Sequence, residues 1–382
     1  MGSSYDVIIV GLGGMGSAAA FHCARSGMRV LGLEQFGIPH DQGSSHGYSR
    51  MIRMAYYEHP DYVPLLRGAY ESWDELGELC GQPVLHRTGG VYMGPADGHV
   101  VPGAIRAAQQ HALAHEPLVR QEIARRYPMF TVPDGYAGVY EPQAGFLIPE
   151  LCVSAHVEQA LRHGADLRAH EPVVGWSAND RAVTVQTSHG TYSASTLVFC
   201  SGTWTGKLLR DLGVELVVTR QVLGWVWPNA DPERFSLGRF PVWGIEQTDG
   251  SLAYGFPTHA GAPGLKLARH GRGTVTDPDR VPRTVTATDE REVQDILERY
   301  LPSAKGPTLT LRTCLYTNSP DGHFIIDRLP GRANVLLAGG FSGHGFKFAS
   351  IIGRTLADLV RGEARAASAV EFLSLARFGR GL

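Results

Sequence analysis

The sequence predicts an α/β protein with two domains. One is an α/β domain assembled from separate segments of the chain, and the other is an α+β domain with a mostly antiparallel sheet. Three observations support this fold class: strand and helix patterns alternate at the N-terminus, the alternation returns near the C-terminus, and the middle predicts strands divided by Pro and Gly. The length of 382 residues also corresponds to about two domains.

The N-terminus predicts a βαβ unit. Tyr5 to Val10 is a short apolar run, rich in β-branched residues, that is typical of a buried strand. Met15 to Ser26 carries small and apolar residues at helical spacing, and Met28 to Glu34 predicts a second strand. We therefore expect two parallel strands joined by a helix.

The first turn of this unit carries a dinucleotide-binding fingerprint. Gly11, Gly13 and Gly16 form GxGxxG, which permits a tight turn, close approach of a pyrophosphate and close packing of the helix on the strand. The helix N-terminus offers N–H groups to phosphates. Glu34, which ends the second strand, can accept hydrogen bonds from a ribose, and an acid here argues against a 2′-phosphate. The pattern predicts a Rossmann-type domain, but it does not distinguish FAD from NAD.

Later segments predict further parts of both domains. Strands are expected at Thr196 to Cys200, Phe324 to Asp327 and Asn334 to Gly340, followed by a helix from about Phe346 to Val360. The stretch from about Val217 to Leu311 alternates in strand fashion, which favours an antiparallel sheet. We assign residues 1–82, 148–216 and 315–382 to the dinucleotide-binding domain, and 83–147 and 217–314 to a substrate-binding domain.

Composition and charge exclude several classes of protein. With 43% hydrophobic and 19% charged residues, the chain is globular rather than disordered. A net charge of -2 gives no overall field that would collect nucleic acid or an anionic membrane. The apolar run from Val7 to Phe21 is broken by four glycines and preceded by Asp6, so we expect neither a signal peptide nor a membrane span.

The cysteines indicate neither a metal site nor a disulfide framework. Five cysteines are present, and none has CxxC spacing. A reducing compartment fits this usage best, and we expect a cytoplasmic protein without a bound metal.

A cationic segment from Ser44 to Tyr57 contains no carboxylate. It holds His46, Arg50 and Arg53, which would share one face if the segment were helical. Clustered cations repel one another unless an anion joins them, and a flavin ring or a carboxylate substrate would supply it. The alternative is a solvated basic face or pairing with distant acids.

A second glycine-rich loop, Gly339 to Phe348, follows a strand and opens a helix. Its N–H groups could stabilise negative charge on a reduced flavin. Lys347 would lie in the first helical turn, where the helix dipole disfavours a cation by roughly 0.3–1 kcal/mol. A specific anionic partner is one explanation, and a lysine that simply reaches solvent is the other.

Two strands of the second domain present polar faces. In TLTLRTCLYT, Arg312, Cys314 and Tyr316 share a face, which makes the cysteine either a reactive thiol or an inert core residue. In GLKLARH, Lys266 and His270 share a face that is either solvated or directed into a cavity. Three tryptophans are either pocket or core residues: Trp225, Trp227 and Trp243.

Several motifs in order along the chain resemble one family. These are GLGGMG, SHGYSRMIRMAY, YGFP followed by GLKL, TCLYT, and HFIID followed by GFSGHGFKF. They resemble the monomeric sarcosine oxidase and N-methyltryptophan oxidase family of FAD-dependent amine oxidases, over essentially the whole chain. The sequence departs from that family around Tyr48 and in the loop THAGAPG.

The resemblance implies roles for individual residues. Cys314 would carry FAD as a thioether, Lys266 would contact flavin N5 through water and activate O2, and Arg53 with Lys347 would bind the substrate carboxylate. The implied catalytic group is Lys266, Arg50, His46, His270 and Tyr254, and the implied substrate-binding group is Arg53, Lys347 and Tyr316. The implied cofactor-binding group is Gly11, Gly13, Gly16, Glu34, Ser44, Ser45, Arg50, Cys314, Gly343, Gly345, Phe346 and Lys347.

The resemblance also implies a reaction. A monomeric protein would oxidise the C–N bond of a secondary, N-methyl amino acid to an imine and reduce O2 to hydrogen peroxide. Oxidation of a cyclic imino acid, a glycated amino acid or another substrate on the same scaffold stays open. So does a flavin-binding sensor or scaffold, and an NAD-dependent dehydrogenase is a weaker alternative, because the glycine-rich C-terminal loop has no purpose there.

Overall fold

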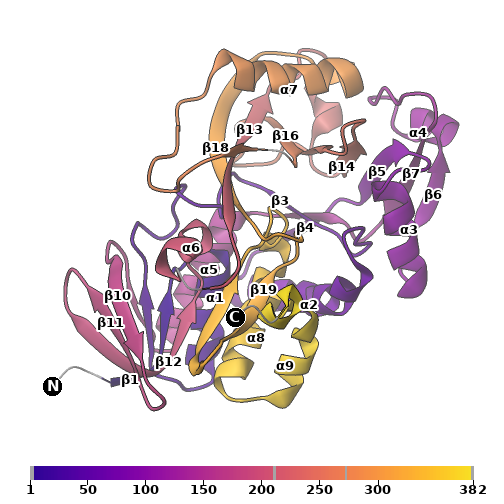
Figure 1. Ribbon diagram of the computed structural model, residues 1–382. Coiled ribbons are helices and arrows are strands. Elements are labelled where there is room, and N and C mark those ends of the chain that lie inside the picture. Colours follow the sequence, from indigo (N-terminus) through magenta and orange to yellow (C-terminus); the bar gives the residue numbers. More distant parts are fainter. Residues whose placement is uncertain (1–3, 210–211, 272, 380–382) are drawn as a thin grey trace.

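Two large sheets organise the computed structural model, which describes residues 4–209, 212–271 and 273–379 (Figure 1). Five parallel strands form the centre of the first sheet, in the order β9, β2, β1, β12, β20. Their bounds are β1 Ser4–Val10, β2 Val30–Leu33, β9 Asp166–Arg168, β12 Thr191–Phe199 and β20 Arg332–Gly339. Antiparallel neighbours complete it: β19 Ile325–Leu329 beside β20, and the hairpin of β10 Val173–Ala178 and β11 Val183–Thr187 beside β12.

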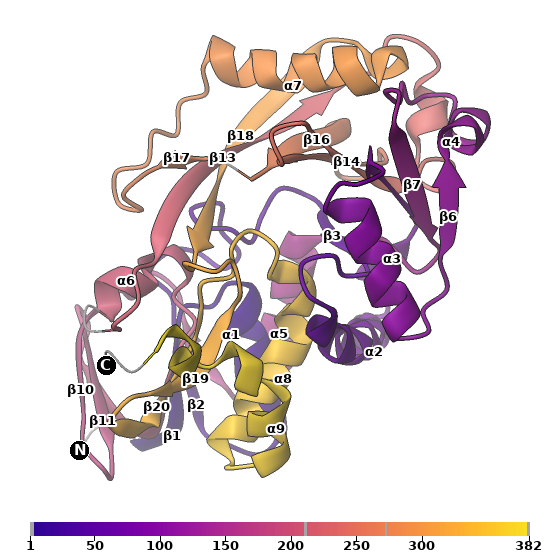
Figure 2. The ribbon, with the colours of Figure 1, turned by 45° about the vertical axis from the view of Figure 1, so that its right-hand side comes forward.

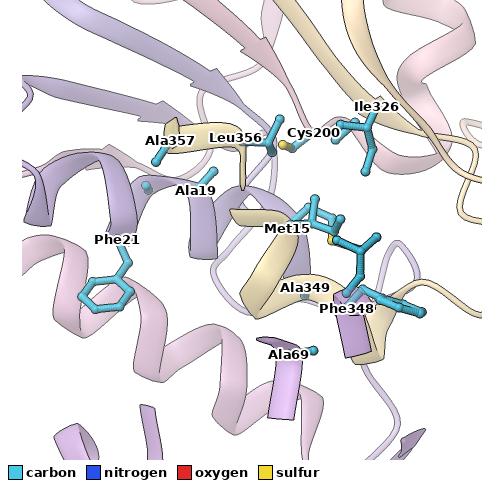
Figure 3. Packing of buried hydrophobic residues seen from close by; sticks show 14 of the residues in the cluster. Met15, Ala19, Phe21, Ala69, Cys200, Ile326, Phe348, Ala349, Leu356 and Ala357 are labelled. Atoms are coloured by element: carbon cyan, nitrogen blue, oxygen red, sulfur yellow. The ribbon is translucent and has the colours of Figure 1, made fainter. Parts of the chain in front are cut away.

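Helices cover one face of this sheet. They are α1 Gly14–Arg25, α2 Val63–Cys80, α5 Pro149–Arg162 and α8 Ala349–Val360. The core between them contains Met15 and Ala19 of α1 and Leu356 of α8 (Figure 3). Gly353 lets α8 approach α1 closely, since a Cβ there would lie 2.4 Å from the Cβ of Ala18. The tight contact fixes the N-terminal ends of both helices relative to the sheet.

The other face of the first sheet is covered as well. Ile8 and Val10 of β1 pack with Val183 and Val185 of the β10–β11 hairpin. Burial on both faces explains why β1 is a continuous apolar run rather than an alternating one.

The second sheet has nine strands in the order β17, β13, β16, β15, β14, β5, β7, β6, with β18 on the free edge of β13. Only β14 and β5 pair in parallel. The bounds are β5 Gly90–Pro95, β6 Glu116–Val119, β7 Tyr136–Glu141, β13 Val217–Val226, β14 Val242–Glu246, β15 Leu252–Phe256, β16 Leu265–His270, β17 Thr274–Val275 and β18 Thr308–Asn318. Helix α7, Ala287–Tyr300, lies across this sheet (Figure 2) and buries Val293 and Leu297 against it.

Smaller elements complete the chain. A three-stranded sheet contains β3 Arg50–Ile52, β8 Gly145–Leu147 and β4 Leu85–Arg87. The remaining α-helices are α3 Val100–Gln110, α4 Arg120–Arg126, α6 Thr205–Leu208 and α9 Ala364–Ala369. Short 3-10 helices are Pro60–Tyr62, Gly202–Trp204, Pro232–Phe235, Pro302–Ala304, Phe346–Phe348, Glu371–Leu373 and Leu375–Phe378.

The predicted fold class is confirmed. The parallel sheet is assembled from three separated parts of the chain, and the second sheet is largely antiparallel, as the sequence patterns predict. The domain boundaries stay a prediction. Within the described ranges, no helix is both long and apolar enough to cross a membrane.

The helical face considered for His46, Arg50 and Arg53 does not form. The cationic segment 44–57 is not helical and instead contains β3. Gly47 and Tyr48 have φ of 99° and 63°, in the left-handed region, which a helix does not allow. Their backbone N–H groups donate to the carboxylate of Glu150, at 2.5 and 3.2 Å. A contact from a distant part of the chain therefore sets the local conformation.

Candidate active site

A cavity of about 350 Å³ lies where the parallel strands β1, β2 and β12 end. Gly11, Gly13 and Glu34 line it from the N-terminal unit. Gly343 and Gly345 line it from the second glycine-rich loop. The predicted cofactor-binding residues Ser44, Ser45, Arg50 and Phe346 also border it. The structure thus brings most of the predicted cofactor group together from three separate parts of the chain.

The glycines of the first turn have different steric roles. A Cβ on Gly11 would lie 2.5 Å from the carbonyl oxygen of Cys200, and one on Gly16 would lie 1.8 Å from the carbonyl oxygen of Gly11. Both are glycines because strand, turn and helix pack too closely for a side chain. A Cβ on Gly13 would meet only the Ser45 Oγ, at 3.5 Å. The missing side chain at Gly13 therefore leaves open space in the cavity, where a phosphate could approach the backbone.

Glu34 presents an ionised acceptor to the same cavity. Its carboxylate accepts from the N–H of Leu12 at 2.9 Å and of Phe36 at 3.0 Å. Burial alone would raise the pKa of Glu34, but His40 and these two amides lower it below the usual value. A buried carboxylate at the end of β2 fits a ribose hydroxyl as partner.

A second, smaller cavity of about 70 Å³ adjoins the first. Arg50, Tyr316, Gly343 and Phe346 border both. The smaller cavity therefore begins where the larger one ends.

Arg53 and Lys347 lie in the wall of the smaller cavity, together with Glu58. The guanidinium of Arg53 donates to both carboxylate oxygens of Glu58, at 2.6 and 2.5 Å. Burial would raise the pKa of Glu58, but Arg53 lowers it to about 2, so the acid is ionised at neutral pH. Burial, followed by the charge of Arg53, lowers the pKa of Lys347 to about 7. Two buried cationic side chains thus face a single carboxylate.

Cys314 lines the smaller cavity beside Arg50, which borders both cavities. Its sulfur is 3.3 Å from an Arg50 nitrogen, and the cysteine is only 1% exposed. The same guanidinium donates to the carbonyl oxygens of Ser44 and Ser49, at 2.8 and 2.9 Å, which fixes its position. The sulfur of Cys314 therefore lies beside a cation whose position is fixed.

Lys266 is buried behind Arg50 and lines neither cavity. Its Nζ donates to the carbonyl oxygens of Gly47 and Ser49, at 2.7 and 2.6 Å, and lies 4.9 Å from the ring centre of Phe256. Burial, followed by the charge of Arg50, lowers the pKa of Lys266 well below its usual value. Two N–H groups of the amine are taken by these two carbonyl oxygens, which fixes its position.

The other predicted catalytic residues lie around this cluster, and of them His46 is buried. Tyr254 and His270 line the smaller cavity, and the His270 Nδ1 lies 3.1 Å from the Tyr316 hydroxyl. Burial lowers the pKa of His270 to about 4. His46 lines neither cavity, and burial, followed by Arg50 and Lys266, lowers its pKa well below the usual value. Both histidines are therefore neutral near pH 7.

The three tryptophans do not form an aromatic pocket. Trp225 and Trp243 are fully buried, and Trp243 packs on Phe130 in the core of the second sheet. Trp227 is 48% exposed. Apolar walls of the smaller cavity come instead from Met51, Leu223, Leu252 and Phe256.

Sequence reasoning missed several residues of the smaller cavity. Glu58 stands one position beyond the segment chosen for its lack of carboxylates, so a slightly longer segment would have included it. His344 stands inside GFSGHGFKF but received no role. Met51 and Leu252 carry no signal that separates a pocket wall from a core position.

Known proteins resemble this chain over nearly its whole length. A family model described as FAD dependent oxidoreductase matches residues 6–359. The monomeric sarcosine oxidase of Streptomyces avermitilis is 43% identical over 361 residues, which cover 94% of each chain. The N-methyl-L-tryptophan oxidase of Salmonella typhimurium is 38% identical and covers 94% of this chain and 95% of its own.

Solved structures share the fold. NikD, an unusual amino acid oxidase essential for nikkomycin biosynthesis, matches with a TM-score of 0.83 at 26% identity, over 96% of this chain and 97% of its own. The L-proline dehydrogenase from P. horikoshii matches with a TM-score of 0.85 over 100% and 99%, but at 21% identity it speaks for the fold alone.

Proposed function

This chain belongs to the FAD-dependent oxidoreductases and, within them, to the family of monomeric sarcosine oxidases and N-methyltryptophan oxidases, and on that basis we propose that it oxidises the C–N bond of a small N-methyl amino acid. The observation that carries the choice of substrate is the smaller cavity. Arg53 and Lys347 provide cationic groups in its wall, and it adjoins the larger cavity at Arg50. An amino acid whose carboxylate lies on the two cations would present its amine toward the cofactor.

The residues of the larger cavity fit FAD. Gly13 leaves room for a pyrophosphate and Glu34 accepts from a ribose, while Ser44, Ser45 and the loop at Gly343 border the remaining length. When bound there, FAD supplies the acceptor for two electrons and passes them to O2.

The residues of this chain position the substrate. A carboxylate bound at Arg53 either replaces Glu58 or shares the guanidinium with it, and Lys347 is the second cation. When both ends of the substrate are held beside the cofactor, a reaction between two separate molecules becomes a reaction within one complex. This positioning is the main contribution that binding can make to the rate. The cations also favour the neutral amine, which carries the electron pair needed for oxidation.

The overall reaction balances. The N-methyl amine loses two hydrogens and becomes an imine, O2 becomes hydrogen peroxide, and water then splits the imine into formaldehyde and the primary amino acid. Lys266, held by the carbonyl groups of Gly47 and Ser49, supports the step with O2.

The size of the smaller cavity favours a short substrate. One water molecule, which has one non-hydrogen atom, needs roughly 10–15 Å³ of cavity volume. A cavity of about 70 Å³ therefore holds about five to seven non-hydrogen atoms. That is close to the size of N-methylglycine and far below that of N-methyltryptophan. Leu252 and Phe256 in the wall are themselves packed in the core, so enlargement would disturb their neighbours.

Peroxide release from purified protein tests the function. We expect turnover of N-methylglycine, with much lower kcat/KM for N-methyltryptophan, L-proline, pipecolate and a glycated amino acid. Turnover of a cyclic or glycated compound in preference to every N-methyl amino acid would replace the proposed substrate. An absence of turnover with any carboxylated secondary amine would remove it.

We further propose that Cys314 attaches FAD covalently, because its sulfur lies in the smaller cavity beside Arg50, which also borders the larger cavity. Acid-precipitated protein should keep its yellow colour, and Cys314→Ser should lose it while still binding FAD reversibly. Cys200→Ser is the matched control, since Cys200 is also buried and also borders the larger cavity. A peptide containing Cys314 at its unmodified mass would contradict the attachment.

We also propose that the protein acts as a monomer in the cytoplasm. All five cysteines are free, which suits a reducing compartment. Its relative from Streptomyces avermitilis is named a monomeric enzyme. A molar mass near 41.4 kDa in solution would support this state.

A further inference from the structure

Tyr56 lies against both cations of the smaller cavity. The guanidinium carbon of Arg53 is 4.5 Å from the centre of the Tyr56 ring, and the Nζ of Lys347 is 5.2 Å from it. Tyr56 is fully buried. A cation over an aromatic face is attracted by the ring, more strongly when both are shielded from water. A single ring therefore contributes to the position of both cations.

A hydrogen-bonded chain fixes that ring. The His344 Nε2 lies 3.0 Å from the carbonyl oxygen of Gly322, which can only accept, so Nε2 carries the proton. In the neutral imidazole Nδ1 is then an acceptor, and the Tyr56 hydroxyl, 2.5 Å away, donates to it. Burial lowers the pKa of His344 to about 3, which keeps the ring neutral. Tyr56, His344 and Gly322 thus pair each donor with one acceptor.

His344 also holds Lys347 through the main chain. The Lys347 Nζ donates to the carbonyl oxygen of His344 at 2.8 Å. Trp73 donates from its indole nitrogen to the carbonyl oxygen of Lys347, also at 2.8 Å. The contact with Trp73 therefore fixes the backbone of Lys347, and the contact with His344 fixes the end of its side chain.

We propose that Tyr56 and His344 form a positioning pair that sets the places of Arg53 and Lys347, and through them the place of the substrate carboxylate. The inference rests on the proposed function, because it takes the two cations as the carboxylate receptor. Tyr56 does not line the cavity, and His344 lines it but stays neutral near pH 7. Both act through the two cations.

Tyr56→Phe in the holoenzyme tests the pair, since it keeps the ring and removes only the hydroxyl that donates to His344. Two substrates are compared, N-methylglycine and N-methylglycinamide, in which an amide replaces the carboxylate. The dissociation constant of acetate, measured from the change in flavin absorbance, gives a readout without turnover. Flavin content and melting temperature report on folding.

The expected result is selective. Acetate should bind about tenfold more weakly, and kcat/KM for N-methylglycine should fall about 10- to 100-fold, the range that small misplacements produce. The amide should react within about twofold of the unchanged enzyme. Tyr62→Phe is the matched control: Tyr62 is buried and hydrogen-bonds the Nδ1 of His323 at 3.2 Å, in a ring pair with Tyr56. It should change none of these constants.

A fall of equal size for the amide, or an equal loss in Tyr62→Phe, would show a general structural defect and overturn the pair. Unchanged acetate binding in Tyr56→Phe would overturn it as well. If the unchanged enzyme oxidises neither compound, the proposed function fails, but the acetate measurement still decides the inference.

Discussion

At the scale of single residues, Lys266 places an amine in the buried interior. Replacing it by Met keeps the volume and removes the donor. Lys266→Met should slow reoxidation of the reduced enzyme by O2 about 10²-fold, the cost of removing one positioned donor. Reduction by substrate should change much less, because Lys266 lines neither cavity. Rapid mixing with O2, and separately with substrate under anaerobic conditions, measures the two steps.

Lys347→Met is the control for that experiment. Since Lys347 lines the smaller cavity, its loss should raise the KM for substrate and leave reoxidation unchanged. Equal slowing of both steps in Lys266→Met would contradict a role in the reaction with O2.

The lowered pKa of Lys347 predicts that carboxylate binding depends on pH. Its pKa is lowered to about 7 by burial and the neighbouring Arg53, so the side chain is protonated below that pH and neutral above it. A carboxylate binds best to the protonated form. The dissociation constant of acetate should therefore rise as pH increases through about 7, and binding should take up a proton on the alkaline side.

Titration of acetate binding from pH 6 to pH 9 measures this dependence. His270 and His344 have pKa values of about 4 and 3, so neither titrates in that range. The inflection should vanish in Lys347→Met. An inflection that persists in that variant belongs to another group.

The sequence could predict which residue types meet at the site but not all of their partners. Arg53 and Lys347 were recognised from motifs, whereas Glu58 was missed although it is only five positions from Arg53. A helix would separate these two residues on different faces. The pair forms because residues 53–58 bend without helical structure, and no local propensity predicts where such a bend brings the next carboxylate.

At the scale of elements, two glycines of the first glycine-rich turn have different roles, one in packing and one in cofactor binding. A Cβ on Gly16 would overlap the carbonyl oxygen of Gly11, so Gly16→Ala should destabilise even the cofactor-free protein, by about 1–3 kcal/mol or more. A Cβ on Gly13 meets no backbone atom at short range. Gly13→Ala should leave that stability nearly unchanged but weaken FAD binding about tenfold or more, because the phosphate must approach there.

These variants are best made in Cys314→Ser, where FAD is expected to bind reversibly. Urea unfolding without FAD and titration with FAD give the two free energies. A loss of cofactor-free stability in Gly13→Ala as large as that in Gly16→Ala would contradict the division of roles.

Element prediction succeeded where the signal is local. The βαβ unit and the helix from Ala349 are encoded by periodicity within a few turns of chain. The conformation of segment 44–57 could not be predicted, because it depends on Glu150, which lies about a hundred positions away in the sequence. Short segments without periodicity take the shape that tertiary hydrogen bonds impose.

At the scale of the whole molecule, the repeated strand–helix pattern was enough to predict a sheet assembled from three segments. The side-chain contacts that join the two sheets beside the larger cavity could not be predicted from the sequence. Asp277 and Asp279 follow β17 of the second sheet, yet they contact Lys207, which follows β12 of the first. Trp204 donates to Asp279 at 2.7 Å, and Trp204, Lys207 and Asp279 all border the cavity.

The position of this contact predicts a modest effect on cofactor release. In Cys314→Ser, the further change Asp279→Asn should speed FAD dissociation only a few-fold, because exposed ion pairs contribute little and salt screens them. The difference should shrink in high salt. Asp249→Asn is the control, since Asp249 pairs with Arg269 on the second sheet and does not border the cavity.

Stopped-flow fluorescence of released FAD follows both variants. If Asp249→Asn speeds release as much as Asp279→Asn does, the loss of a surface charge rather than the contact across the cavity explains the change. An effect of Asp279→Asn that is independent of salt would contradict a contribution from the charge pair with Lys207, because the asparagine oxygen can still accept from Trp204.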